Sequence, residues 1–229
     1  MPTFCVDHPS ALTDYVGIMP PGADISCNSG DPPAPLDRLR KAGLGAFFRP
    51  RQVGEAGLTR DQLRTLVRQG TVEHVARGLY RMADAEPTEH DSLAMACARV
   101  PKSVVCLLSA LRVHEIGTQA PAEVWLAIPH KARAPRPQAI RLAIVRFSGP
   151  AWDLGVTPAT FEGVPARITS PARTVVDCFR FERLVGAEVA MEALRDSLDQ
   201  IKVTVAELSS VEEVLPSRRL RAALDTMSI

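Results

Sequence analysis

Residues 51–82 read RQVGEAGLTRDQLRTLVRQGTVEHVARGLYRM, and this stretch decides the fold of the N-terminal part of the chain. Thr59 and Gln62 have the spacing of a capping box, in which each side chain bonds the other residue's backbone N–H. A helix is therefore expected from Arg60 to Gln69. Gly70 follows it, and glycine is the residue that most readily takes the left-handed conformation that ends a helix.

Two apolar runs follow that helix and predict a β-hairpin. Thr71–Ala76 alternates enough to form a strand, Arg77-Gly78 is suited to a turn, and Leu79–Met82 returns as the partner strand. A glycine next to a basic residue is typical of a tight turn at the tip of such a ribbon.

Further short elements precede the helix. Leu36 begins a helical turn, and the apolar pair Phe47-Phe48 suits a short strand. Pro50 is placed at the first position of a helix that reaches Ala56, where its missing N–H costs nothing. Three helices and a β-ribbon within residues 36–82 predict a winged helix-turn-helix.

The predicted helix from Arg60 has two contrasting sides. At about 100° per residue, Arg60, Arg64 and Arg68 fall within one arc, opposite Leu63, Leu66 and Val67. Arginine binds guanine edges bidentately and also binds phosphate, so this face suits the major groove of DNA. A merely solvated charged face remains the alternative. The side chains expected to contact DNA, with Arg51 and Arg77 on phosphates, are Arg51, Thr59, Arg60, Arg64, Thr65, Arg68 and Arg77.

Charge is distributed unevenly along the chain. The net formal charge is +1 overall, yet it is −4 over residues 1–35, +6 over residues 36–82 and −1 over residues 83–229. A small basic block beside a larger neutral one is typical of a nucleic-acid-binding module attached to another domain.

The elements G-L-T-R-x-x-L-x-x-L-V-R-x-G and R-G-L-Y-R within residues 51–82 resemble the N-terminal winged-helix domain of AbiEi-type antitoxins of type IV toxin-antitoxin systems. Residues 104–117 (VVCLLSALRVHEIG) and 167–179 (RITSPARTVVDCF) are similar to two segments of that family's C-terminal domain. The resemblance covers about residues 36–225.

The resemblance implies a bacterial antitoxin that represses its own operon. Its winged helix would bind inverted repeats in double-stranded operator DNA. Its partner would be a separately encoded nucleotidyltransferase-like toxin, which the C-terminal domain counteracts with or without a stable complex.

The rest of the chain predicts a mixed α+β antitoxin C-terminal domain, because its strands and helices do not alternate regularly. Glu162-Gly163 is a hairpin signal, with Thr160-Phe161 before it and Val164–Ile168 after it. The other expected strands are Val124–Ile128 and Ile140–Phe147. The expected helices are Glu89–Arg99, Leu107–Glu115, Pro171–Phe181, Val185–Leu198 and a last stretch over Ala206–Leu224.

The stretch His130–Pro137 (HKARAPRP) combines basic residues with two prolines, and so predicts a basic loop. Lys131, Arg133 and Arg136 form a possible secondary basic surface. Such a loop tracks DNA phosphates, docks on an RNA or an acidic toxin surface, or is simply a solvated hairpin. Arg218, Arg219 and Arg221 pose the same choice.

No catalytic residue, cofactor or metal is expected. The sequence has no G-x-S-x-G elbow, no glycine-rich phosphate loop and no pair of ligands at zinc spacing. Arg173 and Asp177 are expected to pair with each other across one helical turn, and His114 near Ser109 resembles a catalytic triad only in composition. A stand-alone regulator that senses a ligand or partner, and a nuclease targeted by the winged helix, are the competing functions.

Residues 1–35 are rich in proline and lack apolar periodicity, which predicts a disordered leader and leaves Met19 as an alternative start. The domains expected are therefore 1–35, 36–82 and 83–229. The longest apolar run, Val104–Leu108, is far below the roughly 20 residues that span a bilayer. With no secretory signal and five cysteines read as free thiols, the protein is expected to be cytoplasmic, with no membrane partner.

Overall fold

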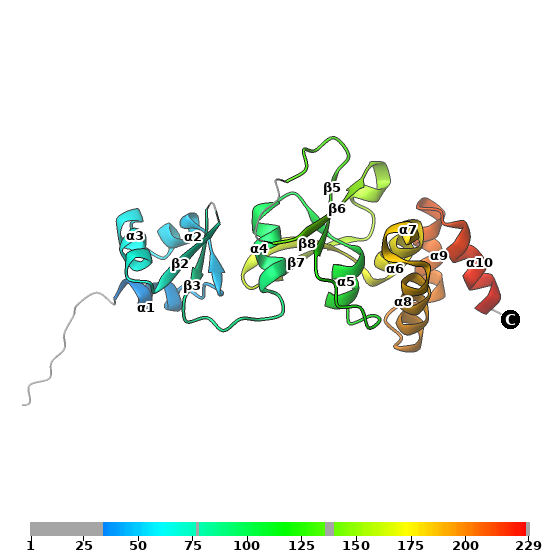
Figure 1. The fold of residues 1–229 in the computed structure, drawn as a ribbon, viewed down its shortest axis with the longest axis horizontal. Helices are drawn as coiled ribbons and strands as arrows, with labels where there is room; N and C mark the ends of the chain where they lie inside the picture. Colours follow the sequence, from blue (N-terminus) through cyan, green and yellow to red (C-terminus); the bar gives the residue numbers. More distant parts are fainter. Residues whose placement is uncertain (1–33, 77, 136–139, 228–229) are drawn as a thin grey trace, which may run out of the picture. The chain divides into compact units, whose positions relative to one another are not determined.

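The computed structural model describes residues 34–76, 78–135 and 140–227, which belong to one compact unit, Pro33–Ile229 (Figure 1). These residues form a mixed α+β structure with two sheets, in agreement with the predicted class. The predicted leader, residues 1–35, lies almost entirely outside the described residues. Within the described ranges, no helix is long and apolar enough to cross a membrane.

Three helices and a three-stranded sheet make up the first part of the described chain. The helices are α1 (Pro35–Lys41), α2 (Pro50–Glu55) and α3 (Arg60–Arg68). The strands are β1 (Phe47–Phe48), β2 (Val72–Ala76) and β3 (Leu79–Met82), in the spatial order β1-β3-β2 with antiparallel pairing throughout. Each predicted element of residues 36–82 is therefore present, within a residue or two at its ends.

The core of this part confirms the apolar side assigned to α3. Leu63 and Leu66 are buried, and Val67 packs at the edge of the same cluster. The buried side chains that complete the cluster come from all the surrounding elements: Leu39, Phe48, Val53, Leu58, Val72 and Met82.

A five-stranded mixed sheet follows, with the order β6-β5-β4-β8-β7. Its strands are β4 (Val104–Val105), β5 (Val124–Pro129), β6 (Leu142–Phe147), β7 (Val156–Phe161) and β8 (Val164–Thr169). β5 pairs with β6 and β4 with β8 in parallel, and the other pairs are antiparallel. The central strand β4 was not predicted, because two apolar residues before a helix carry no period of their own.

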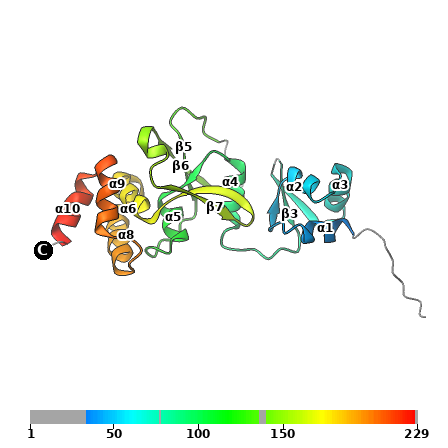
Figure 2. The ribbon, with the colours of Figure 1, turned by 180° about the vertical axis from the view of Figure 1, so that it is seen from behind.

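Helices cover this sheet and extend beyond it (Figures 1 and 2). α4 (Asp91–Arg99) packs on β8, α5 (Leu107–Val113) packs on β5, and a short 3-10 helix, η1 (Gly149–Trp152), precedes β7. α6 (Pro171–Arg180) is buried from Ala172 to Phe179 and contacts α5. The helices packed around α6 are α7 (Glu182–Val185), α8 (Ala187–Asp199), α9 (Val205–Val214) and α10 (Arg218–Met227).

Several predicted boundaries in residues 83–229 were wrong, and three of them concern the helices. The stretch Ala206–Leu224 is two helices, since Pro216 lies in the break between α9 and α10 and proline disfavours a helical residue before it. The helix expected from Val185 begins at Ala187, because Gly186 has a φ of +97°. The helix expected from Glu89 begins at Asp91.

The two predicted domains share a core. Phe47 and Leu79 belong to a buried cluster that also contains Phe161, Val164 and residues of α4. The backbone of Gly45 lies so close to the β7–β8 turn that an added Cβ would stand 2.7 Å from the carbonyl oxygen of Glu162. The division at residues 82 and 83 is therefore crossed by tightly packed side chains and backbone.

Candidate nucleic-acid interface

The start of α3 is fixed by the predicted capping box. Thr59 Oγ1 accepts a hydrogen bond from the backbone N–H of Gln62 at 3.2 Å. Gln62 Oε1 accepts one from the backbone N–H of Thr59 at 2.9 Å. Because two orphan N–H groups are satisfied here, the helix begins at Arg60, which sets the direction of every later side chain.

The outer face of α3 carries the predicted arginines, and Arg60, Arg64 and Arg68 are all exposed. Arg64 Nη1 lies 3.1 Å from Asp61 Oδ1, and Arg68 Nη2 donates to Thr65 Oγ1 at 3.2 Å. The side chains of Arg64 and Asp61 are 78% and 87% exposed, so their ion pair is weak and readily exchanged for a ligand. These guanidiniums are available to bind anions or base edges.

A cavity of about 730 Å³ adjoins this face. One wall is α3 and the other is the β2–β3 hairpin. His74 and Tyr80 come from the hairpin, and their rings are 5.0 Å apart. The lining residues are Asp61, Arg64, Thr65, Val67, Arg68, His74 and Tyr80.

His74 and Tyr80 were missed by the sequence reasoning. The alternation of β2 places His74 on the face of the strand opposite Val75, and this signal was available in the sequence. The pairing of His74 with Tyr80 across the hairpin depends on register, which a sequence pattern does not fix when the strand contains a bulge.

The other predicted DNA contacts are placed less centrally. Arg51 is exposed on α2 and pairs with Glu55 at 3.2 Å, and it does not line the cavity beside α3. Thr65 Oγ1 donates to the backbone oxygen of Asp61 at 3.0 Å, so its hydroxyl hydrogen is used within the helix. Arg77 lies outside the described residues.

The predicted basic loop is described only in part. Lys131 and Arg133 are exposed, whereas Arg136 lies outside the described residues. Arg146 on β6 fastens the start of this loop, since its Nη1 donates to the carbonyl oxygens of His130 at 2.5 Å and Ala132 at 2.8 Å. Arg146 was not singled out in the sequence, where it resembles any other strand residue.

The predicted pair of Arg173 and Asp177 is confirmed, and it is fully buried. Arg173 Nε donates to Asp177 Oδ2 at 2.8 Å, and its two Nη atoms donate to the carbonyl oxygens of Leu154 and Ala151. Arg180 Nη1 donates to the other carboxylate oxygen, Oδ1, at 2.8 Å. Burial raises the pKa of the Asp177 carboxyl, and the two guanidiniums oppose that shift. The donors of Arg173 point to protein oxygens, which makes this cluster structural.

The structure does not assemble the other residues considered for catalysis. Ser109 Oγ accepts a hydrogen bond from the backbone N–H of Trp125 at 2.9 Å, whereas His114 Nε2 lies 2.7 Å from the carbonyl oxygen of Thr169. Burial lowers the pKa of His114. Over the described ranges, no group of three potential metal ligands occurs.

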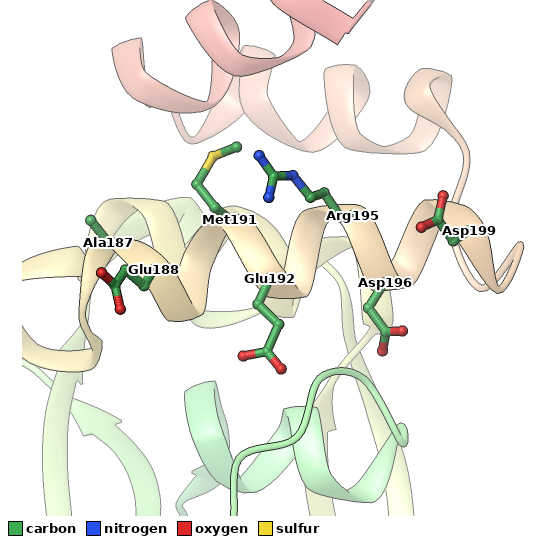
Figure 3. A pocket seen from close by; sticks show the side chains of 7 residues that line it. All are labelled: Ala187, Glu188, Met191, Glu192, Arg195, Asp196 and Asp199. Atoms are coloured by element: carbon green, nitrogen blue, oxygen red, sulfur yellow. The ribbon is translucent and has the colours of Figure 1, made fainter.

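A further cavity of about 540 Å³ lies along α8, and Figure 3 shows the acidic side chains that line it. Glu192 and Asp196 point toward the loop after α5. Glu192 accepts hydrogen bonds from Thr118 and Gln119, which lower its pKa, and Asp196 accepts one from the backbone N–H of Gly117. These carboxylates hold that loop against α8, so they are already occupied.

The described cysteines agree with the expectation of free thiols. Cys97, Cys106 and Cys178 are free and buried, and burial raises the pKa of Cys97 to about 12. A thiol in that state is unreactive at neutral pH. Cys5 and Cys27 lie outside the described residues.

Comparison with known proteins bears on the fold and on the N-terminal part. No curated protein matches the chain. The crystal structure of the RV2827C protein from Mycobacterium tuberculosis is similar in fold, with a TM-score of 0.50 and 18% sequence identity over 79% of this chain and 72% of that chain. Residues 45–83 match the family described as "Transcriptional regulator, AbiEi antitoxin", and the resemblance read from the sequence is confirmed over that segment.

Proposed function

We propose that the protein is a DNA-binding transcriptional regulator of the AbiEi antitoxin type. In this proposal residues 36–82 act as a winged helix-turn-helix, α3 enters the major groove and the β2–β3 hairpin is the wing. The protein would act in the cytoplasm, where its operator is, without a cofactor and without catalysis.

The observation that carries the proposal is the two-sided character of α3. Leu63 and Leu66 on its apolar side are buried in the core. Arg60, Arg64 and Arg68 are exposed on the other side. An exposed row of arginines beside a hairpin matches the way in which such modules contact base edges and phosphates. The family match covers this same segment.

The antitoxin role rests on the family match and on the resemblance of the later segments. The operator would contain inverted repeats, and binding would repress the operon that encodes the protein. The remainder of the chain, residues 83–229, would counteract a nucleotidyltransferase-like toxin encoded next to it. The second candidate function is a stand-alone regulator whose C-terminal part senses a ligand or partner. The buried cluster that contains both Phe47 and Phe161 favours this candidate. A ligand-induced conformational change in residues 83–229 would alter the packing of residues 36–82 through that cluster.

DNA binding is tested with Arg60→Ala/Arg64→Ala and two duplexes, the sequence upstream of the protein's own gene and a scrambled version. We expect each base-reading arginine to contribute about 1–3 kcal/mol on the upstream duplex and little on the scrambled one. Arg183→Ala/Arg195→Ala removes the same charge from exposed positions on α7 and α8, and serves as the control. Equal affinity of wild type and the Arg60/Arg64 variant for the upstream duplex would show that α3 is not the reader.

The antitoxin role is tested separately by co-expression with the neighbouring toxin gene. We expect growth to be rescued by the full chain and also by the Arg60→Ala/Arg64→Ala variant, because neutralisation is assigned to residues 83–229. Continued growth arrest with the full chain would leave a regulator of the stand-alone kind.

A further inference from the structure

The β2–β3 hairpin separates two concave surfaces. One is the cavity beside α3, into which the hairpin contributes His74 and Tyr80. The other is a cleft of about 440 Å³ to which the hairpin contributes Val75 and Ala76. The remaining lining residues of this second cleft come from α4 and from the region around β5 and β6: Ser92, Met95, Arg99, Ala122, Ile140 and Arg141.

The bulge in β2 explains how adjacent residues serve both surfaces. Successive strand residues point to opposite faces, so His74 and Val75 face opposite ways. The register of β2 against β3 shifts between His74 and Ala76, which turns Ala76 to the same cleft as Val75. The hairpin therefore has a concave, arginine-bearing surface on each side.

The charges in the second cleft are uncompensated. Arg99 and Arg141 line it together with the hydroxyl of Ser92, and no carboxylate lines it. Neighbouring arginines in the same region do have partners, since Arg81 pairs with Asp91 at 3.3 Å and Arg49 donates to the carbonyl oxygen of Ala98. Within the part of the chain that the structure describes, the guanidiniums of Arg99 and Arg141 have no hydrogen bond and no ion pair.

We propose that this cleft binds the phosphodiester backbone of DNA, through Arg99 and Arg141, on the side of the hairpin opposite α3. This inference rests on the proposed function and extends the DNA interface into residues 83–229. It assigns to that segment a DNA contact that its net charge of −1 conceals.

The geometry of B-DNA explains why phosphates are expected there. A hairpin that enters the minor groove is flanked by the phosphates of both strands, because that groove is only about 6 Å wide. With α3 in the neighbouring major groove, one row of phosphates lies toward the cavity of His74 and the other toward Arg99 and Arg141. Guanidinium groups match phosphate oxygens bidentately. The apolar side chains of Val75, Met95 and Ile140 offer a surface for the deoxyribose.

The test uses the full chain with Arg99→Ala/Arg141→Ala and measures affinity for the upstream and scrambled duplexes at several salt concentrations. Backbone contacts carry no sequence information, so affinity for both duplexes should fall by the same factor, about tenfold. Each lost phosphate contact should lower the magnitude of the log–log salt slope by about 0.9, and the double variant by about 1.8. An unchanged salt slope would overturn the proposal.

Two further variants distinguish a loss of DNA contacts from a loss of folding. Arg183→Ala/Arg195→Ala removes the same charge away from the cleft and should leave the slope within about 0.5 of the wild type. Ser92→Asp places a carboxylate at an exposed position in the first turn of α4, where the helix tolerates acid well, and should weaken binding to both duplexes. Full affinity of Ser92→Asp for both duplexes would contradict the proposal.

Failure of this inference is distinguishable from failure of the proposed function. If α3 reads DNA but the cleft does not bind it, Arg60→Ala/Arg64→Ala loses affinity for the upstream duplex while Arg99→Ala/Arg141→Ala does not. If the wild-type chain binds neither duplex, both ideas fall together. A rise in melting temperature with deoxyadenosine monophosphate that Arg99→Ala/Arg141→Ala abolishes, with DNA binding unaffected, would overturn the backbone assignment in favour of a free phosphate ligand.

Discussion

α3 and α6 both carry arginine beside aspartate at helical spacing, and the structure gives them opposite characters. On α3 the Arg64 side chain is 78% exposed and its bond to Asp61 is open to solvent. On α6 the Arg173 side chain is 0% exposed and is held by Asp177 and two carbonyl oxygens. An exposed arginine with one weak partner is free to bind a ligand, whereas a buried one with satisfied donors is part of the fold.

The largest expected effect comes from removing the buried Arg173 side chain on α6. Arg173→Ala leaves the Asp177 carboxylate buried with only Arg180, and we expect unfolding to become easier by about 3–5 kcal/mol. Urea denaturation measures the change. Arg68→Ala on the exposed face of α3 is the matched control, and its stability should stay within about 0.5 kcal/mol of the wild type. Equal stability of the two variants would remove the distinction between the helices.

A smaller effect is expected at the start of α3. Thr59→Ala removes the side-chain acceptor for the backbone N–H of Gln62, and should lower stability by about 1 kcal/mol. Thr59→Ser retains the hydroxyl and should restore most of that loss. If both variants melt like the wild type, the capping box does not set the start of this helix.

The stability of the folded chain should depend on pH through His114, whose Nε2 lies 2.7 Å from the carbonyl oxygen of Thr169 just before α6. Burial lowers the pKa of His114 in the folded chain, so the unfolded chain binds its proton at higher pH. The contribution of this group to stability is therefore present above the unfolded pKa of about 6.5, and is lost as the pH falls through the folded pKa. His114→Gln should lose less stability than the wild type between pH 7 and pH 5 in urea titrations. Parallel curves for the two proteins would contradict this assignment.

The smallest expected effect on stability concerns the exposed Arg64–Asp61 pair on α3. Asp61→Asn removes the partner of Arg64, and stability should change by less than about 0.5 kcal/mol because the pair is solvated. Affinity for scrambled DNA should rise, since an acidic side chain leaves the cavity wall beside α3. Glu55→Gln on α2, which removes the exposed partner of Arg51, is the control outside that cavity. A drop in scrambled-DNA affinity for Asp61→Asn would indicate that Asp61 orients Arg64.

The sequence was sufficient for the elements of residues 36–82 because their signals are local. A capping box at Thr59, a proline at the start of α2 and glycines at helix ends each act within one or two turns. The same local reasoning found the Arg173–Asp177 pair, which spans a single turn of α6.

Contacts between distant residues were beyond that reasoning. β4 has only two residues, and its place at the centre of the five-stranded sheet depends on β5 and β8. The cavity beside α3 needs the register of β2 against β3, and the cleft of Arg99 and Arg141 needs three separate segments to meet. None of these is encoded in a short window of sequence.

The packing of Gly45 against the β7–β8 turn has a consequence for the modularity of the chain. A Cβ added at Gly163 would stand 3.2 Å from the backbone of Gly45, and Phe47 and Leu79 complete a core that lies largely beyond residue 82. An N-terminal fragment ended at Met82 would expose these two apolar side chains to water. We therefore expect the protein to unfold in a single calorimetric transition. Residues 36–82, if fused to another protein, should fold only when the β7–β8 turn at Glu162-Gly163 is included as well.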